Sequence, residues 1–417
     1  MIKKIKTSQL KLGMFVHDFN CSWFTHPFVK NRLMITDQGM IDKVISYDIK
    51  EVYIDTAQGI DIGGGVIGKG ETVVAEMPEE IPTPGTPAII LDTFEETLAL
   101  LKPRSVGDEI PQALRLREKA QKLLESVFAD VRSGKQIDIA PTRDMAEDMV
   151  KSAYRNSAAM PCVAKLSDAG DGLLSHSINV CSLMVAFCRH AGMDAETTLD
   201  AAIGALLHDV GMLKVDPRVL SLQGQATPEE FQEQSKHVQY SYEILSETPG
   251  VPLVARQIGE LHHERYDGQG YPYGLKGDNI PQIIQMASIV NTYDALTSKK
   301  ANNSGLKATM GLKRIFEIAA RGVLNEKLVH DFIRCMGLYP IGTMVRLSSD
   351  KVGVVIRQNP ESLLKPLVRV LYDLKKDCYI RPRDLDFANL PENRQNERIV
   401  ANENSSKWNI DILQYIH

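Results

Sequence analysis

Histidine and aspartate residues recur in a fixed order through the middle of the chain, where they end apolar segments. His208 and Asp209 end the run LDAAIGALLHD, and His262 and His263 end the run IGELHH. A histidine beside a carboxylate is costly to bury unless something satisfies both, and a divalent cation would do so. Adjacent helical residues point about 100° apart, so the first pair can approach one ion from two sides, or Asp209 can bridge two ions.

Two further histidines belong to the same series. His176 lies in an otherwise apolar predicted helix, and His237 opens the amphipathic segment HVQYSYEILSE. Imidazole and carboxylate ligands without thiolates suit iron, manganese, zinc or nickel, so the residues leave the identity of the metal open. Two such ions about 3.5–4 Å apart would place a bridging hydroxide in line with a phosphodiester phosphorus. The series therefore predicts hydrolysis of a phosphoester.

The segment that follows His263 makes this prediction more specific. HHERYDGQGYP at 262–272, together with the His208–Asp209 pair, resembles the HD-GYP family of cyclic di-GMP phosphodiesterases. The resemblance covers roughly 141–335, and the N-terminal part resembles the small domain that often precedes HD-GYP domains in bacteria. It implies hydrolysis of a cyclic dinucleotide, cyclic di-GMP above all, by a hydroxide bridged between two divalent ions, with iron or manganese preferred.

The resemblance also implies a role for each residue. His176, His208, Asp209 and Asn291 would hold one metal ion. The other ion would share Asp209 and add His237, His262 and His263. His208 and Asp209 would be catalytic, with Asp209 as the bridging carboxylate. The expected substrate-binding residues are Arg265, Asp267, Gly270, Tyr271, Pro272, Lys214 and Lys300.

Several positions depart from the family pattern. Met212 stands where the family usually has a phosphate-contacting lysine, and Lys214 is the nearby candidate to replace it. Asn291 stands in place of an aspartate ligand, and a neutral amide holds a cation less tightly. Lys300 replaces an arginine, which keeps the charge but loses the bidentate fork. Gly172 replaces the glutamate with which some members hold a third metal, so we expect two metal ions.

Three functions follow from these residues. The first is an active cyclic di-GMP phosphodiesterase, which we favour because six of the seven ligand positions keep the expected residue. The second is a degenerate domain that binds a cyclic dinucleotide and signals without turnover, as Met212 and Asn291 would allow. The third is a phosphodiesterase for hybrid cyclic GMP-AMP.

Composition and pattern divide the chain of 417 residues. The predicted fold is mainly α, a helical bundle of the HD superfamily, with a small α/β domain before it and a small β element after it. Thr142, which follows a proline, is the expected N-cap of the helix that opens the bundle. The expected segments are a small α/β domain at 1–62, a Gly/Pro-rich linker at 63–90, connecting helices at 91–140, the HD-GYP domain at 141–337, an antiparallel β element at 338–388 and a loosely ordered polar tail at 389–417.

Charge and cysteine content limit the partners and the compartment. The net charge of −5 gives no reason to expect long nucleic acid as a partner. Six cysteines without a CxxC pair predict a reducing cytoplasm. We find no run of about 18 apolar residues, so we expect no membrane span. The N-terminal domain, which has no recognisable catalytic residues, is expected to regulate the enzyme, to form a homodimer or to contact a signalling partner.

Overall fold

The structure, a computed structural model, consists of two compact units, which meet in sequence between residues 88 and 89. It describes residues 2–18, 33–36, 38–46, 50–56, 59–60, 93–166, 172–220, 227–298, 305–359, 361–408 and 410–416. The linker expected at 63–90 and the substrate-binding candidate Lys300 lie outside these residues.

The N-terminal unit is a four-stranded antiparallel sheet with one helix, as its alternating pattern predicts. Its strands are β1 (Ile2–Lys6), β2 (Phe15–Asp18), β3 (Leu33–Met34) and β4 (Glu51–Asp55), in the order β1-β4-β2-β3. The helix is α1 (Gln38–Ser46). Apolar residues on alternate strand positions, such as Val52 and Ile54, are fully buried together with Val44 of α1. The short strand β1, which pairs with β4, was not predicted from the sequence.

The second unit begins with a mainly helical part that has one core. Its central helix, α6 (Gly172–His190), packs against six others and is apolar almost all round, as expected for a helix enclosed by protein. By length and composition α6 could cross a membrane, but 72% of its apolar window is buried inside the protein. The other helices of this part are α2 (Phe94–Ala99), α3 (Val106–Arg132), α4 (Ile139–Arg155), α5 (Ala159–Leu166), α7 (Ala195–Leu207), α8 (Pro217–Leu220), α9 (Pro228–Ser235), α10 (His237–Glu247), α11 (Leu253–Leu261), α12 (Gln282–Thr297), α13 (Ala308–Ala319) and α14 (Glu326–Met336).

The helix that opens the predicted bundle starts earlier than the sequence indicated. Asp138, not Thr142, is the N-cap of α4, and its carboxylate accepts a hydrogen bond from the Ala140 N–H. Pro141 then lies in the first helical turn, where proline is tolerated because that N–H has no partner within the helix. Thr142 is buried instead. The prediction failed because a proline inside the first turn was read as one before the helix.

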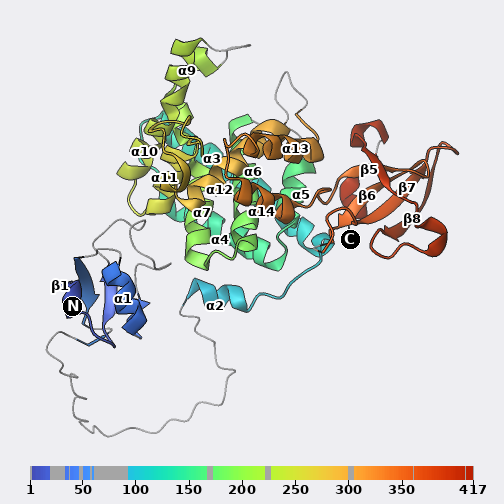
Figure 1. Cartoon of the computed structure of the whole chain (residues 1–417). Coiled ribbons are helices and arrows are strands. Elements are labelled where there is room, and N and C mark those ends of the chain that lie inside the picture. Colours follow the sequence, from blue (N-terminus) through green and yellow to red (C-terminus); the bar gives the residue numbers. More distant parts are fainter. Residues whose placement is uncertain are drawn as a thin grey trace, which may run out of the picture. The chain divides into compact units, whose positions relative to one another are not determined.

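A five-stranded antiparallel sheet lies at one side of the helical part (Figure 1). Its strands are β5 (Met344–Leu347), β6 (Lys351–Arg357), β7 (Leu367–Asp373), β8 (Cys378–Asp386) and β9 (Ile399–Asn402), in the order β8-β7-β6-β5-β9. The expectation of a loosely ordered tail after 388 was wrong, because β9 pairs with β5 and Trp408, Ile412 and Ile416 are buried. These three apolar residues are widely spaced in an otherwise polar segment, so the sequence pattern gives little indication that the segment packs onto the core.

Candidate metal centre

Four elements of the helical part carry the predicted ligands to one place. His208 is the C-cap residue of α7, and Asp209 follows it directly. His237 is the first residue of α10, while His262 and His263 directly follow α11. Helix α11 packs against both α7 and α10, and α10 packs against the 3-10 turn Val210–Lys214 that follows Asp209. His176 reaches the same place from the central helix α6.

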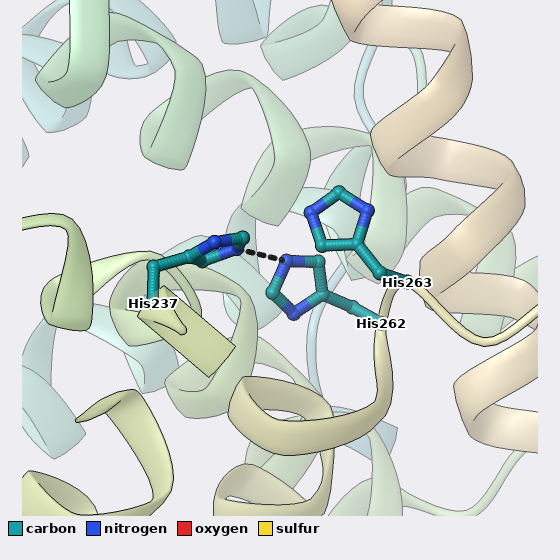
Figure 2. A group of neighbouring side chains, drawn as sticks. All are labelled: His237, His262 and His263. Atoms are coloured by element: carbon teal, nitrogen blue, oxygen red, sulfur yellow. Dashed lines mark hydrogen bonds between the residues drawn. The ribbon is translucent and has the colours of Figure 1, made fainter. Parts of the chain in front are cut away.

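The ligand atoms form two groups that meet at Asp209. His176, His208 and Asp209 form one group and His237, His262 and His263 the other, and within each group the candidate atoms lie within 4.8 Å of one another. Figure 2 shows the rings of the second group turned toward one another. The Asp209 Oδ2 atom is 3.3 Å from the Nε2 atom of His208, whereas Oδ1 is 3.4 Å from that of His237 and 3.5 Å from that of His262. One carboxylate thus presents an oxygen to each group.

Backbone carbonyl groups fix the orientation of three imidazole rings. The Nδ1 atoms of His208, His237 and His262 lie 3.0, 2.8 and 2.9 Å from the carbonyl oxygens of Ala205, Gln234 and Ile258. A carbonyl oxygen only accepts, so each Nδ1 carries the proton and each Nε2 presents a lone pair. The three lone pairs point toward Asp209, which is how imidazole ligands are oriented around a cation.

The buried polar atoms of this site are better suited to bind a divalent metal ion than to form hydrogen bonds with one another. Within the described part of the chain, the buried His208 Nε2 and Asp209 Oδ1 atoms have no hydrogen-bond partner. Burial opposes ionisation of Asp209, but His208, His262 and His237 hold the pKa of its carboxyl well below the usual range. Burial lowers the pKa of His262 to about 4 and also lowers the pKa of His237. An ionised carboxylate among neutral imidazoles is the protonation state that metal ligation requires.

Two residues of α12 contact the two ring nitrogens of His176. Asp294 accepts a hydrogen bond from His176 Nδ1 through Oδ2 at 2.6 Å, and Asn291 lies with its Oδ1 atom 2.8 Å from Nε2. Burial alone lowers the pKa of His176, but the hydrogen bond and charge of Asp294 outweigh it and raise the pKa. The structure therefore places Asn291 beside the Nε2 atom of His176 and Asp294 beside its Nδ1 atom.

The Gly-Tyr-Pro segment folds directly against the second histidine group. The Tyr271 ring stacks on the His263 ring, with centroids 4.7 Å apart and planes 19° apart. Glycine is needed at position 270, because a Cβ atom there would lie 2.3 Å from the backbone nitrogen of Arg265. The buried Glu264 carboxylate accepts hydrogen bonds from the backbone N–H groups of residues 273 and 275, which pins the segment in place. The Tyr271–Pro272 peptide bond is cis.

The other predicted substrate-binding residues differ in how near they lie to the histidine groups. The Arg265 guanidinium donates to Ser288 Oγ at 2.5 Å, beside the histidine pair. The Asp267 carboxylate accepts from the Gln269 N–H, so it shapes the turn before the Gly-Tyr-Pro segment. The Lys214 ammonium lies 4.0 Å from the Glu243 carboxylate, on the surface of α10.

Three residues that support the site were not predicted from the sequence. Asp294 and Glu264 hold His176 and the Gly-Tyr-Pro segment. Ser241 donates a hydrogen bond to the His208 carbonyl and accepts one from the Gly211 N–H, which ties α10 to the His208–Asp209 corner. Helix α7 ends at Leu207, four residues before Gly211. A Cβ atom at Gly211 would lie 2.1 Å from the His237 carbonyl oxygen, so glycine is needed for this close contact.

Two family models match the chain. A model described as a domain of unknown function, DUF3391, matches residues 2–142, and a model described as an HD domain matches residues 143–321. The first match extends beyond the N-terminal unit to the start of α4, so the region that this family model covers includes helices α2 and α3. The second match contains all seven predicted metal ligands.

Curated relatives share both parts or the HD part alone. A cyclic di-GMP phosphodiesterase of Pseudomonas aeruginosa is 30% identical over 98% of this chain and 94% of its own length. The response regulator RpfG of Xanthomonas campestris, also a cyclic di-GMP phosphodiesterase, is 28% identical over 54% of this chain and 57% of its own. A 3′3′-cGAMP-specific phosphodiesterase of Vibrio cholerae is 38% identical over 23% of this chain and 18% of its own. Among solved structures, an HDG"Y"P protein from Bdellovibrio bacteriovorus aligns with a TM-score of 0.45 at 17% identity, covering 80% of this chain and 98% of its own.

Proposed function

The chain belongs to the HD-GYP family of cyclic di-GMP phosphodiesterases, and on that premise we propose that it hydrolyses cyclic di-GMP at a site that holds two metal ions. The observation that carries the proposal is the position of Asp209, which presents one carboxylate oxygen to each of two histidine groups. The similarity over nearly the full length to a cyclic di-GMP phosphodiesterase supports the choice of substrate.

The two histidine groups would hold one ion each. His176, His208 and Asp209, with Asn291 beside them, form the first site; His237, His262 and His263 form the second and share Asp209. Nitrogen and oxygen donors without sulfur suit iron or manganese, and also zinc or nickel. Two bound ions supply an activated water at neutral pH and stabilise negative charge on the phosphoryl oxygens.

The protein's own residues orient the reactants. The carbonyl groups behind His208, His237 and His262 keep those Nε2 lone pairs turned inward without a proton, so no step has to remove one. The Arg265 guanidinium, next to the histidine pair, is the nearest candidate to receive a phosphate oxygen, and the Tyr271 ring over His263 offers a face to a base.

Asn291 and Met212 are expected to weaken the reaction without abolishing it. Asn291 already lies with its amide oxygen 2.8 Å from His176 Nε2, so it can donate that oxygen to an ion held by the ring. The loss of one negative charge from the site lowers the metal affinity. Lys214, the candidate to replace the lysine that stands at Met212 in the family, lies 4.0 Å from the Glu243 carboxylate.

Turnover by metal-loaded protein tests the proposal. Purified protein, with its metal content measured, is incubated with cyclic di-GMP, and linear and mononucleotide products are separated by chromatography. We expect turnover by the wild-type protein and none by the His208→Ala variant, with Lys119→Ala, an exposed position on α3, as the matched control. Metal-loaded wild-type protein that binds cyclic di-GMP without cleaving it would instead establish a degenerate binding module.

The preferred dinucleotide is a separate question, because relatives named for 3′3′-cGAMP match the same domain. Side-by-side turnover of cyclic di-GMP and 3′3′-cyclic GMP-AMP by one preparation answers it. We expect the larger kcat/KM for cyclic di-GMP, since the relative that matches almost the whole chain bears that name. The opposite ranking would assign the chain to the hybrid dinucleotide.

We place the reaction in the cytoplasm and assign regulation to the N-terminal unit. The described cysteines, Cys162, Cys181, Cys188, Cys335 and Cys378, are all free thiols, as in a reducing compartment. The N-terminal unit has its own small core and presents no cluster of metal ligands among its described residues. We therefore propose that it acts through dimerisation or a signalling partner.

A further inference from the structure

A cavity lies beside His176, and the lining of this cavity does not include His237, His262 or His263. It has a volume of about 910 Å³ and is enclosed by α3, α5, α6 and the first strands of the C-terminal sheet. Of the metal-centre residues in the described part of the chain, His176 and Asp294 line this cavity, whereas Asp209 and the Gly-Tyr-Pro segment do not. A volume of this size is ample for one nucleotide-sized ligand, since such pockets measure about 300–1,000 Å³.

Two cations line this cavity, and neither has a carboxylate oxygen within 4.0 Å among the residues that the structure describes. The Arg117 guanidinium of α3 donates to the Asn179 side-chain oxygen at 2.8 Å, and the Lys165 ammonium at the end of α5 donates to Thr343 Oγ at 2.6 Å. Both partners are neutral. Each cation therefore keeps donors that a phosphate could accept from.

Among the described residues, the acidic residues of the cavity make no direct ion pair with these cations, although the charge of Asp294 acts on Arg117. Asp294 bonds His176, and Asp411 accepts from the Leu413 N–H and the Gln414 amide. Within the described ranges, neither they nor Glu403, the third carboxylate of the wall, lies within 4.0 Å of the Arg117 or Lys165 nitrogens.

The rest of the wall suits a flat ring. Leu183, Met336 and Ile341 contribute apolar surface, and Tyr293 adds an aromatic ring. A ligand with a phosphate at one end and a base at the other would match both the cations and the apolar surface. Inorganic phosphate alone would leave most of the cavity unfilled.

We propose that this cavity binds a nucleoside monophosphate, with the phosphate held by Arg117 and Lys165. The site shares only His176 with the proposed metal ligands and does not depend on turnover, so it goes beyond the proposed function. Its ligand would lie against the Asp294 and His176 side chains, within reach of the metal centre but not in it.

Calorimetric titration of the full chain with GMP tests this inference. A chelator is present throughout, so that phosphate cannot bind through metal ions. We expect saturable binding by the wild-type protein at one site. Arg117→Gln and Lys165→Gln should each weaken it at least tenfold, because each removes one cation from the phosphate. Arg117→Lys should retain most of the affinity, since it keeps the charge.

Arg115→Gln, an exposed position on the same helix, is the matched control and should bind GMP like the wild-type protein. Thermal melting of each variant identifies any that fails to fold, and the Arg117→Lys protein then provides the comparison. Absence of GMP binding by the wild-type protein, or equal affinity in the Gln variants, would overturn the proposal. Inorganic phosphate binding as tightly as GMP would also overturn it, because the apolar wall would then contribute nothing.

Discussion

Replacement of Asp294 by alanine should loosen one of the two proposed metal sites and leave the other intact. The Asp294 carboxylate accepts the Nδ1 proton of His176 at 2.6 Å, and its side chain is only 6% exposed. No other described group bonds that nitrogen, so the variant leaves the ring free to turn its Nε2 atom away from Asp209. In the second histidine group, His237 and His262 are held by backbone carbonyls and do not use Asp294.

The expected magnitude follows from the type of contact. A hydrogen bond to a buried charged group contributes about 1.5–3 kcal/mol. Loss of the carboxylate behind a metal-bound histidine lowers metal affinity about 10–100-fold, which corresponds to about 1.4–2.7 kcal/mol. The two ranges agree, so we expect the weaker of two binding steps to shift about thirtyfold. Asp294→Asn should shift it less, because an amide oxygen can still accept the proton.

Competition between the protein and a chromogenic chelator for Mn²⁺ measures both steps. The titration is run at about pH 8, where protons compete little with metal for imidazole. Asp331→Ala, which removes a partly buried carboxylate paired with Arg334 on α14, is the matched control and should bind two ions as the wild-type protein does. Two unchanged binding steps in the folded Asp294→Ala protein would refute the assignment of His176 as a ligand oriented by Asp294. Equal weakening of both steps would refute the division into two sites.

Three further variants test other parts of the reasoning. Asn291→Asp restores an anionic oxygen beside His176 and should raise metal affinity in the same titration; a fall would show that the amide is no ligand. Gly270→Ala should abolish turnover and lower the melting temperature, because the new Cβ atom would lie 2.3 Å from the backbone nitrogen of Arg265. A fully active variant would contradict this close packing of the Gly-Tyr-Pro segment. Burial alone raises the pKa of Glu109, but its hydrogen bonds with Arg155 and Ser152 outweigh burial and lower the pKa overall. The ionised Glu109 carboxylate therefore stabilises the fold above the pKa that it has in the unfolded chain. This stabilisation is lost as the pH falls through the lower pKa of the folded protein. Glu109→Gln should cost about 3 kcal/mol at neutral pH, less in acid, as measured by urea unfolding at both pH values; an equal loss in acid would exclude the charge as the cause.

The chemistry of the site was open to prediction because its residues are both unusual and ordered. Histidine and aspartate at the ends of apolar helices are costly to bury without a ligand, so HD at 208–209 and HH at 262–263 carry a signal that a single histidine lacks. The mainly helical fold with flanking β elements was confirmed, since long periodic segments identify helices well. The strand β9 was missed because short polar segments carry little periodicity, and the cap of α4 was missed because Pro141 was read as lying before the helix.

The sequence by itself determined which residues can hold metal ions and in what order they come along the chain. The tertiary structure alone decided which of them share a carboxylate, that Asp294 backs His176 instead of replacing Asn291, and that Arg117 and Lys165 face a common cavity. The physical reason is that ligand types are a property of side chains, which the sequence lists. Their distances depend on how α3, α5, α6, α10 and α12 pack, and that packing depends on the whole core at once.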